Sequence, residues 1–202
     1  MFLVGLTGPS ASGKSHLIAL LQQELKEELC VLSQDMYYFP RELQKKDEKG
    51  YENFDVPEAI DQMLFMEHLH ELLKGNSIQQ KVYTYNRKEG QSDFLEVASA
   101  PIVLVEGIFI PAMPVLDELL QYRIYMDAPH ELRFQRRLHR DQKERGYSAE
   151  EIQYRYQMHT EHAVEVFLEP WRHKADLLIE NTGELSPDAV TLASFFRGKI
   201  TL

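Results

Sequence analysis

The residues best suited to chemistry form an octapeptide near the N-terminus that is rich in small side chains. It consists of Gly8, Pro9, Ser10, Ala11, Ser12, Gly13, Lys14 and Ser15. This segment matches G-x-x-x-x-G-K-[ST], the loop that cradles phosphate between a strand and a helix. Its backbone N–H groups can converge on phosphate oxygens, and the helix N-terminus adds about half a positive charge. We expect Lys14 to reach the transferring phosphate and the Ser15 hydroxyl to bind magnesium.

Glu106 is a candidate for the same magnesium site. It follows the four aliphatic residues 102–105, so its carboxylate should lie at the carboxyl end of a buried strand. Ligands collect at that edge in open α/β sheets. The alternative is that Glu106 only caps the next turn.

Asp35 ends a second apolar run, about twenty residues after Lys14. A doubly wound topology would place it on the same edge as the phosphate loop, where it could also bind the metal. Phosphoryl transfer needs orientation of the attacking hydroxyl more than its early deprotonation. We therefore expect Asp35 to orient a substrate hydroxyl and to accept its proton late. The alternative role is helix capping.

A basic segment follows at residues 129–147. From residue 129 to residue 146 there are six basic and three acidic residues, a local excess of three positive charges. Arg133, Arg136, Arg137 and Arg140 recur at i, i+3, i+4 and i+7, which places them on one face of a helix. This spacing predicts a helical lid in which Arg136 and Arg140 bind ATP and Arg137 stabilises transition-state charge. A solvated face paired with nearby acids is the alternative.

The elements that must position these residues follow from hydrophobic periodicity. Five apolar runs alternate with helical segments and predict a parallel sheet with helices on both faces. The runs are residues 2–7, 30–33, 102–105, 122–126 and 177–179. A helix is expected over residues 57–74. Alternating residues on both sides of 86–90 predict a β-hairpin at about residues 77–97. The predicted fold class is therefore α/β, with a hairpin and a lid added to a phosphate-loop domain.

Composition narrows the class of protein. The 202 residues predict one domain covering residues 1–202. The net charge of −10 argues against nucleic acid as a partner, since binding its phosphates requires clustered Lys and Arg. Cys30 is the only cysteine, which favours a reducing compartment. The most apolar stretch, residues 98–116, contains Glu106 and three prolines, so no membrane span is expected. Together these features predict a cytoplasmic protein.

Other nucleotide-binding classes lack their signatures here. The sequence contains no Asn-Lys-x-Asp, which a GTPase would use to recognise guanine. It also has no G-x-G-x-x-G, which a dinucleotide-binding fold requires. His159 and His162 could converge on a helix, but a third zinc ligand is missing.

With these residues in place, the chain resembles the uridine kinases of the uridine kinase and phosphoribulokinase group nearly end to end. The most discriminating match is N-F-D-x-P-x-A at residues 53–59. The other matching segments are residues 8–15, 32–38, 82–85, 103–107, 136–141 and 145–146.

The resemblance implies roles for several residues. Asp35 would be the base that faces the sugar 5′-hydroxyl, and Asp55 would hold the ribose 2′ and 3′ hydroxyls. Tyr38 and Tyr83 would line the nucleoside pocket, and Arg133 would help to hold the substrate. From the sequence alone, Asp55 could instead be a helix-start acid and Tyr83 a cross-strand packing residue.

One departure concerns the base. The uridine kinases carry a histidine and an arginine in the pattern Y-x-[YF]-x-x-H-x-R, where this chain has Lys88 and Gly90. We expect an enzyme that uses ATP, or GTP, with magnesium to phosphorylate the 5′-hydroxyl of uridine or cytidine. Two alternatives are transfer to another ribosyl or hydroxylated metabolite, and a nucleotide-binding regulator without transfer. The resemblance also implies a possible homo-oligomer.

Overall fold

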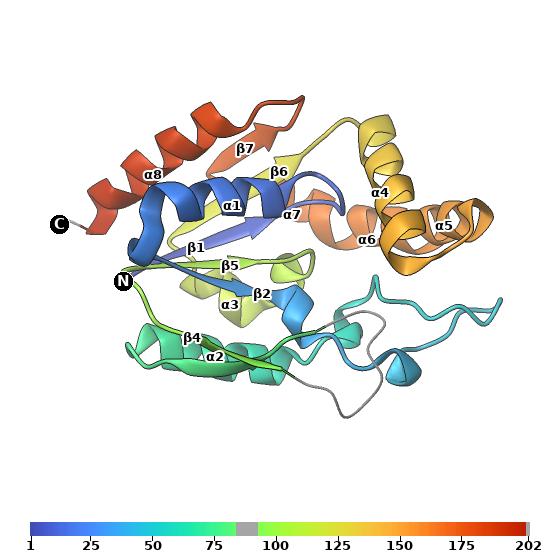
Figure 1. Ribbon diagram of the computed structural model, residues 1–202, viewed down its shortest axis with the longest axis horizontal. Helices are drawn as coiled ribbons and strands as arrows, with labels where there is room; N and C mark the ends of the chain where they lie inside the picture. The colour runs from blue at the N-terminus through green and yellow to red at the C-terminus, as the bar shows by residue number, and fades with distance from the viewer. Residues whose placement is uncertain (84–92, 201–202) are drawn as a thin grey trace.

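A five-stranded parallel sheet forms the centre of the computed structural model, which describes residues 1–83 and 93–200 (Figure 1). The order of the strands is β2-β5-β1-β6-β7, and each neighbouring pair is parallel. The strands are β1 (Phe2–Thr7), β2 (Leu29–Ser33), β5 (Ile102–Glu106), β6 (Tyr122–Asp127) and β7 (Leu177–Glu180). The sequence predicted these five strands, and the predicted fold class is confirmed.

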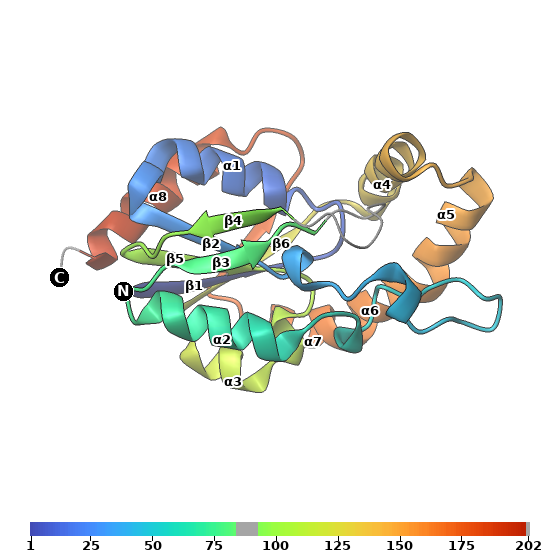
Figure 2. The same cartoon turned by 60° about the horizontal axis from the view of Figure 1, so that its bottom comes forward.

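Helices cover both faces of this sheet because its central strands are apolar on both sides. Alternate residues enter two separate cores, with Leu3 and Val103 in one and Val4 and Leu104 in the other. Helices α1 (Lys14–Leu25) and α8 (Ser186–Ile200) cover one face. The other face packs against α2 (Gln62–Leu73), α3 (Pro114–Leu119) and α7 (Glu169–Arg172) (Figure 2).

A separate hairpin lies beside α2. Strand β3 (Ile78–Lys81) pairs antiparallel with β4 (Phe94–Val97), and Ile78 lies opposite Val97. The predicted hairpin is confirmed in its two strands. Its predicted turn, including Lys88 and Gly90, lies outside the described residues.

A run of helical segments extends beyond the carboxyl ends of the strands, at the opposite end of the molecule from both termini (Figure 1). It begins with α4 (His130–Arg145), which ends at Gly146 in the left-handed conformation with φ +72°. The run continues through α5 (Ala149–Arg155), a π-helical turn (Tyr156–Thr160), α6 (Glu161–Ala163) and a second π-helical turn (Val164–Leu168). Helix α4 is the segment that the sequence predicted as a lid, and its closure stays a prediction.

The helix predicted over residues 57–74 begins later than expected. Residues Pro57–Ala59 form a single 3₁₀ turn, and Ile60 is extended with φ −118° and ψ 150°. Helix α2 then begins at Gln62, because the Asp61 carboxylate accepts a hydrogen bond of 2.9 Å from the Leu64 N–H and caps it. The remaining 3₁₀ turns are Lys26–Glu28, Gln34–Tyr37, Arg41–Leu43 and Ile110–Ala112.

Nowhere in the described ranges does a helix have both the length and the apolar character that crossing a bilayer demands.

Asp117 on α3 joins three elements at the amino-terminal edge of the sheet. Its carboxylate accepts hydrogen bonds from Arg123 Nε (2.9 Å), Trp171 Nε1 (3.0 Å) and Lys174 Nζ (3.0 Å). Burial alone would raise the pKa of Asp117, but these hydrogen bonds outweigh burial and hold the pKa below its usual value. The ionised carboxylate therefore contributes stability above the unfolded pKa of about 3.9, and this contribution is lost as pH falls through the folded pKa.

We expect Asp117→Asn to lower the free energy of unfolding at pH 7 by about 1–3 kcal/mol, because the three donors to this partly buried carboxylate lose their charge-assisted bonds. The same variant should lose less stability than the wild type as pH falls below about 4. Denaturant titrations across this range measure both effects. If the free energy of unfolding of the variant falls with pH as steeply as that of the wild type, the stabilising role of the ionised Asp117 carboxylate is contradicted.

Candidate functional site

A cavity of about 600 Å³ lies at the carboxyl ends of the strands, under helix α4. It brings together most of the residues that the sequence singled out. Those that line it are Ser10, Ala11, Gly13, Lys14, Ser15, Asp35, Tyr38, Asp55, Tyr83, Glu106, Arg136, Arg137 and Arg140. Strands of a parallel sheet place their carboxyl ends at one edge, which explains why loops distant in sequence meet here.

The phosphate loop owes its shape to two glycines with positive φ. Gly8 has φ +148° and Gly13 has φ +109°. A Cβ at Gly8 would lie 1.9 Å from the carbonyl oxygen of Met126, and one at Gly13 would lie 2.2 Å from Asn181 Nδ2. No side chain fits either position. Asn181 Nδ2 also donates a 2.8 Å hydrogen bond to the Ser12 carbonyl, so the segment after β7 supports the loop.

Two cations lie over this loop. Lys14 Nζ donates hydrogen bonds to the carbonyls of Gly8 (2.8 Å) and Pro9 (3.1 Å). Arg136 Nη1 reaches from α4 to the Ala11 carbonyl at 3.4 Å. Burial lowers the pKa of Lys14, whereas the carboxylates of Glu106 and Asp35 oppose that shift. Positive charge is thus concentrated where the motif binds phosphate.

The carboxylates of Glu106 and Asp35 face the loop from the ends of β5 and β2. Ser33 Oγ donates a hydrogen bond to Glu106 Oε1 and accepts one of 3.2 Å from the Asp35 N–H, so one hydroxyl holds the Glu106 carboxylate and the backbone at Asp35. Burial, together with the negative charge of Asp35, raises the pKa of Glu106 to about 7, and Lys14 opposes this rise. The two carboxylates therefore repel each other electrostatically.

Ser15, Asp35 and Glu106 present hydroxyl and carboxylate oxygens to the same cavity. Magnesium prefers hard oxygen ligands, and it is often bound by one or two carboxylates together with substrate phosphates. Within the described residues, no three or more His, Cys, Asp and Glu side chains form a cluster that could hold a metal alone. The donor set suits a magnesium ion that arrives with a nucleotide.

Asp55 lies at the other end of the cavity and is only 8% exposed. Its Oδ2 accepts a 2.8 Å hydrogen bond from Thr160 Oγ1 and lies 3.5 Å from Arg137 Nη2. Burial would lower the pKa of Arg137, but Asp55 and Asp141 outweigh burial and raise it, so the guanidinium stays charged. Asp55 is thereby held as a buried, paired carboxylate.

An aromatic wall stands beside Asp55. The ring of Tyr38 lies 5.7 Å from the ring of Phe54 and 5.7 Å from the ring of Tyr83, measured between centroids. Burial and the negative charges of Asp35 and Asp55 raise the pKa of Tyr38, so its hydroxyl stays protonated. The cavity therefore offers apolar ring faces beside Asp55, together with the hydroxyl donors of Tyr38 and Tyr83.

The arginines of α4 do not form one open face. Arg137 is buried, while Arg133 does not line the cavity; it donates to the Ala128 carbonyl (3.0 Å) and pairs with Asp127 (3.4 Å). The buried Asp141 carboxylate pairs with Arg137 (3.3 Å), Arg140 (2.9 Å) and Arg145 (3.4 Å). One acid beneath three guanidinium groups reduces their mutual repulsion.

Sequence reasoning missed several residues of the cavity. Asn181 lies two residues after the last apolar run, and the rule that identified Glu106 would have selected Glu180 instead. Phe54 lies inside the N-F-D motif. No local signal marked Thr160, whose contact with Asp55 depends on a π-helical turn. The other lining residues that were not predicted are His16, Met36, Ile108, Arg145 and Gly183.

Comparisons with known proteins agree on one family. Residues 3–186 match the model of the Phosphoribulokinase / Uridine kinase family. A uridine kinase of Borrelia turicatae (strain 91E135) is 33% identical over 201 residues, which cover 96% of this chain and 94% of that protein. A uridine kinase of Shewanella amazonensis (strain ATCC BAA-1098 / SB2B) is 31% identical over 187 residues, covering 90% and 88%.

Two solved structures share the fold. A possible uridine kinase from Bacillus stearothermophilus superposes with a TM-score of 0.61 at 19% identity, and the match covers 88% of each chain. A phosphoribulokinase from Rhodobacter spheroides superposes with a TM-score of 0.64 at 17% identity, covering 89% of this chain and 69% of that one.

The support that Asn181 gives to the phosphate loop can be tested by Asn181→Ala. The variant loses the hydrogen bond to the Ser12 carbonyl, so the loop amides are less well ordered for phosphate. We expect the dissociation constant of a non-hydrolysable ATP analogue to rise about tenfold, the effect of about 1.4 kcal/mol from one buried hydrogen bond. Calorimetric titration measures it.

Asn76→Ala is the matched control, since the Asn76 amide donates one 2.7 Å hydrogen bond to Glu71 on the exposed surface of the α2 end. Its nucleotide affinity should equal that of the wild type. Equal affinities of all three proteins would show that Asn181 does not support the loop.

Proposed function

The chain belongs to the Phosphoribulokinase / Uridine kinase family, and from this premise we propose that it transfers the γ-phosphoryl group of ATP to the 5′-hydroxyl of uridine or cytidine. Members of the family are kinases, and this protein is a kinase. The observation that carries the finer proposal is that Asp35 and the phosphate loop line the same cavity as Asp55 and its aromatic wall. One cavity thus offers a place for a triphosphate and for an alcohol acceptor.

The triphosphate would lie on the loop of residues 8–15. Its charge would meet the loop amides, Lys14, and Arg136 and Arg140 from α4, all of which line or surround the cavity. In a loose transition state, negative charge spreads over the transferring phosphoryl oxygens. Charges already in place at the cavity stabilise that state without further reorganisation.

Ser15, Glu106 and Asp35 would hold magnesium, because their oxygen atoms suit a hard cation. Bound magnesium would neutralise charge on the phosphates. The Ser33 hydroxyl contributes by holding the Glu106 carboxylate and the backbone N–H of Asp35.

The acceptor would lie between Asp35 and Asp55. Asp35 would orient the 5′-hydroxyl and accept its proton late, while Asp55 would accept hydrogen bonds from the ribose 2′ and 3′ hydroxyls. Arg137 pairs with Asp55, and Thr160 donates a hydrogen bond to it, so both hold the side chain in place. Tyr38, Phe54 and Tyr83 would pack against the base. Arg133, which pairs with Asp127, would act on the substrate only through the placement of α4.

The proposed pyrimidine preference is supported by the named relatives, and the proposed cytoplasmic location is supported by composition. Cys30 is a free, buried thiol, which suits a reducing compartment. A panel of acceptors with labelled ATP tests the preference. It contains uridine, cytidine, purine nucleosides, free ribose and ribulose 5-phosphate.

We expect kcat/KM for uridine or cytidine to exceed that of every other acceptor by at least about tenfold, which is 1.4 kcal/mol of differential transition-state binding. A faster reaction with another ribosyl or hydroxylated acceptor would replace the pyrimidine proposal. Tight binding of ATP without product from any acceptor would support the regulator alternative.

The role of Asp35 gives a second test. Asp35→Asn keeps the side-chain shape but cannot accept the proton, so kcat with the best acceptor should fall by about 10²- to 10⁴-fold. The dissociation constant of ATP should change by less than about fivefold, since the loop amides, Lys14 and Arg136 are intact. Turnover close to that of the wild type would overturn the base assignment.

A further inference from the structure

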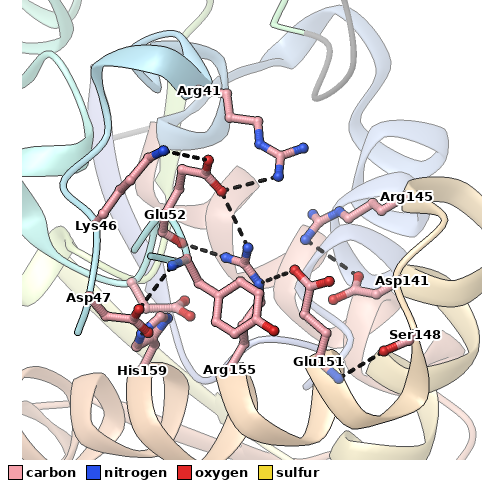
Figure 3. Close-up of polar contacts among 12 residues, drawn as sticks. Arg41, Lys46, Asp47, Glu52, Asp141, Arg145, Ser148, Glu151, Arg155 and His159 are labelled. Atoms are coloured by element: carbon pink, nitrogen blue, oxygen red, sulfur yellow. Dashed lines mark hydrogen bonds and ion pairs between the residues drawn. The ribbon is translucent and has the colours of Figure 1, made fainter. Parts of the chain in front are cut away.

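We propose that Arg155, which lies outside the cavity, is a positioning residue for the acceptor. It fixes the segment of residues 51–55 against helix α5 and so holds Asp55 where the ribose hydroxyls would bind. This inference rests on the proposed function in one respect, the role of Asp55 as an acceptor ligand. The contacts of Arg155 with Glu52 and Glu151 are shown in Figure 3.

The guanidinium of Arg155 joins two segments that are about a hundred residues apart in sequence. It is 5% exposed, and Nη1 donates to the backbone carbonyl of Glu52. Nη2 lies 3.4 Å from Glu52 Oε2, and Nε donates to Glu151 Oε1 at 2.9 Å. Arg155 thus binds both the main chain and the side chain of Glu52 through two separate nitrogens of a planar fork, a geometry that the single nitrogen of a lysine does not offer.

Aromatic rings complete the packing around this guanidinium. Its Cζ lies 5.0 Å from the ring centroid of Tyr51 and 4.9 Å from that of Tyr147. A desolvated cation near two ring faces gains further attraction. The residue is therefore tightly enclosed, and replacing it would free the segment that it holds.

Glu52 is ionised in this arrangement. Burial would raise its pKa, but hydrogen bonds from its own backbone amide, Arg41 and Arg155 outweigh burial and lower it. The other two cations that pair with Glu52 are Arg41 at 3.1 Å and Lys46 at 3.9 Å. Both belong to the same loop as Glu52, so Arg155 is the partner that connects the loop to the helices (Figure 3).

Hydrogen bonds at further points also hold the loop on the helical run. His159 Nε2 lies 2.9 Å from Asp47 Oδ2, and Thr160 Oγ1 donates to Asp55 Oδ2 at 2.8 Å. Between the Arg155 contact and Asp55, the side chain of Asn53 accepts a 2.9 Å hydrogen bond from the Asp55 N–H. Because Glu52 is only three residues from Asp55, fixing Glu52 also restricts where the Asp55 carboxylate, the proposed acceptor ligand, can lie.

The phosphate side of the cavity is built independently of this loop. Its supports are the glycines of the loop, Asn181, and Arg136 on α4, and none of their contacts described above involves Arg155. Weakening the Arg155 contact should therefore reduce the fraction of molecules with Asp55 in place without changing the ATP site. The apparent affinity for the acceptor falls in proportion to that fraction.

Arg123 offers a matched control. Like Arg155, it bonds a carboxylate through Nε, to Asp117 at 2.9 Å, and the backbone carbonyl of the same residue through Nη2. It lies near the amino end of β6, at the opposite edge of the sheet from the cavity. Its replacement tests what loss of such an arginine does to stability alone.

Steady-state kinetics of Arg155→Gln and Arg123→Gln, with the best acceptor and ATP varied separately, test the proposal. In Arg155→Gln we expect the KM for the acceptor to rise about tenfold, as it would if the competent fraction fell to about one tenth. The KM for ATP should stay within about twofold. Arg155→Lys, which keeps the charge but loses the fork, should fall between the wild type and Arg155→Gln.

Arg123→Gln should lower the melting temperature and leave both KM values within about twofold. The proposal is overturned if folded Arg155→Gln has an unchanged acceptor KM. It is also overturned if both KM values rise together, or if Arg123→Gln produces the same change.

Hydrogen exchange gives a readout that needs no acceptor. Amides of residues 45–55 should exchange faster in Arg155→Gln than in the wild type, and at the wild-type rate in Arg123→Gln. Unchanged protection overturns the positioning role even if the kinase accepts none of the acceptors tested. If the kinase accepts none of the acceptors tested but exchange is faster in Arg155→Gln, the positioning of the loop is supported, and only the role given to Asp55 is removed. If Arg155→Gln does not fold, Arg155→Lys decides both readouts.

Discussion

The whole site depends on the close packing of the phosphate loop, which leaves no room for a side chain at Gly8 or Gly13. At Gly8 a Cβ would meet the Met126 carbonyl on β6, and at Gly13 it would meet Asn181 after β7. The phosphate loop is therefore packed into the carboxyl edge of the sheet rather than lying freely above it. Since β1 lies between β5 and β6, the loop is centred at that edge. Every other charged group of the cavity is placed relative to this fixed point.

Positive and negative side chains lie together in the cavity, and those of opposite charge help each other to remain charged despite burial. Burial disfavours the charged forms of both Lys14 and Glu106, and each partly restores the charge of the other. On the lid side, Asp141 beneath three arginines lessens the repulsion that their helical spacing implies. Such a site is organised in advance, because its dipoles and charges are already oriented before any phosphate arrives. The cost is a set of buried ions that each need a partner.

Local patterns sufficed for the sheet and for the strand-end acids, because apolar runs and their last residues can be identified from neighbours in sequence. The start of α2 was predicted wrongly, since the extended Ile60 and the cap at Asp61 override the helix-favouring Pro57. Pairs such as Arg137 with Asp55 were out of reach, because they join residues far apart whose contact depends on the finished packing. For the same reason, the arginine spacing identified a helical face but not that Arg137 would be buried in it.

The two aspartates assigned to the acceptor belong to different parts of the molecule. Asp35 follows β2, and its backbone N–H donates to Ser33, so it is attached to the sheet. Asp55 is bonded to Thr160 and Arg137, so it is attached to the helical run that begins at α4. Arg136 reaches the phosphate loop from that same run. Any displacement of the helices would therefore change phosphate contacts and acceptor alignment together. In-line transfer tolerates little misplacement, so under the proposed function these helices would align the phosphate and the acceptor together.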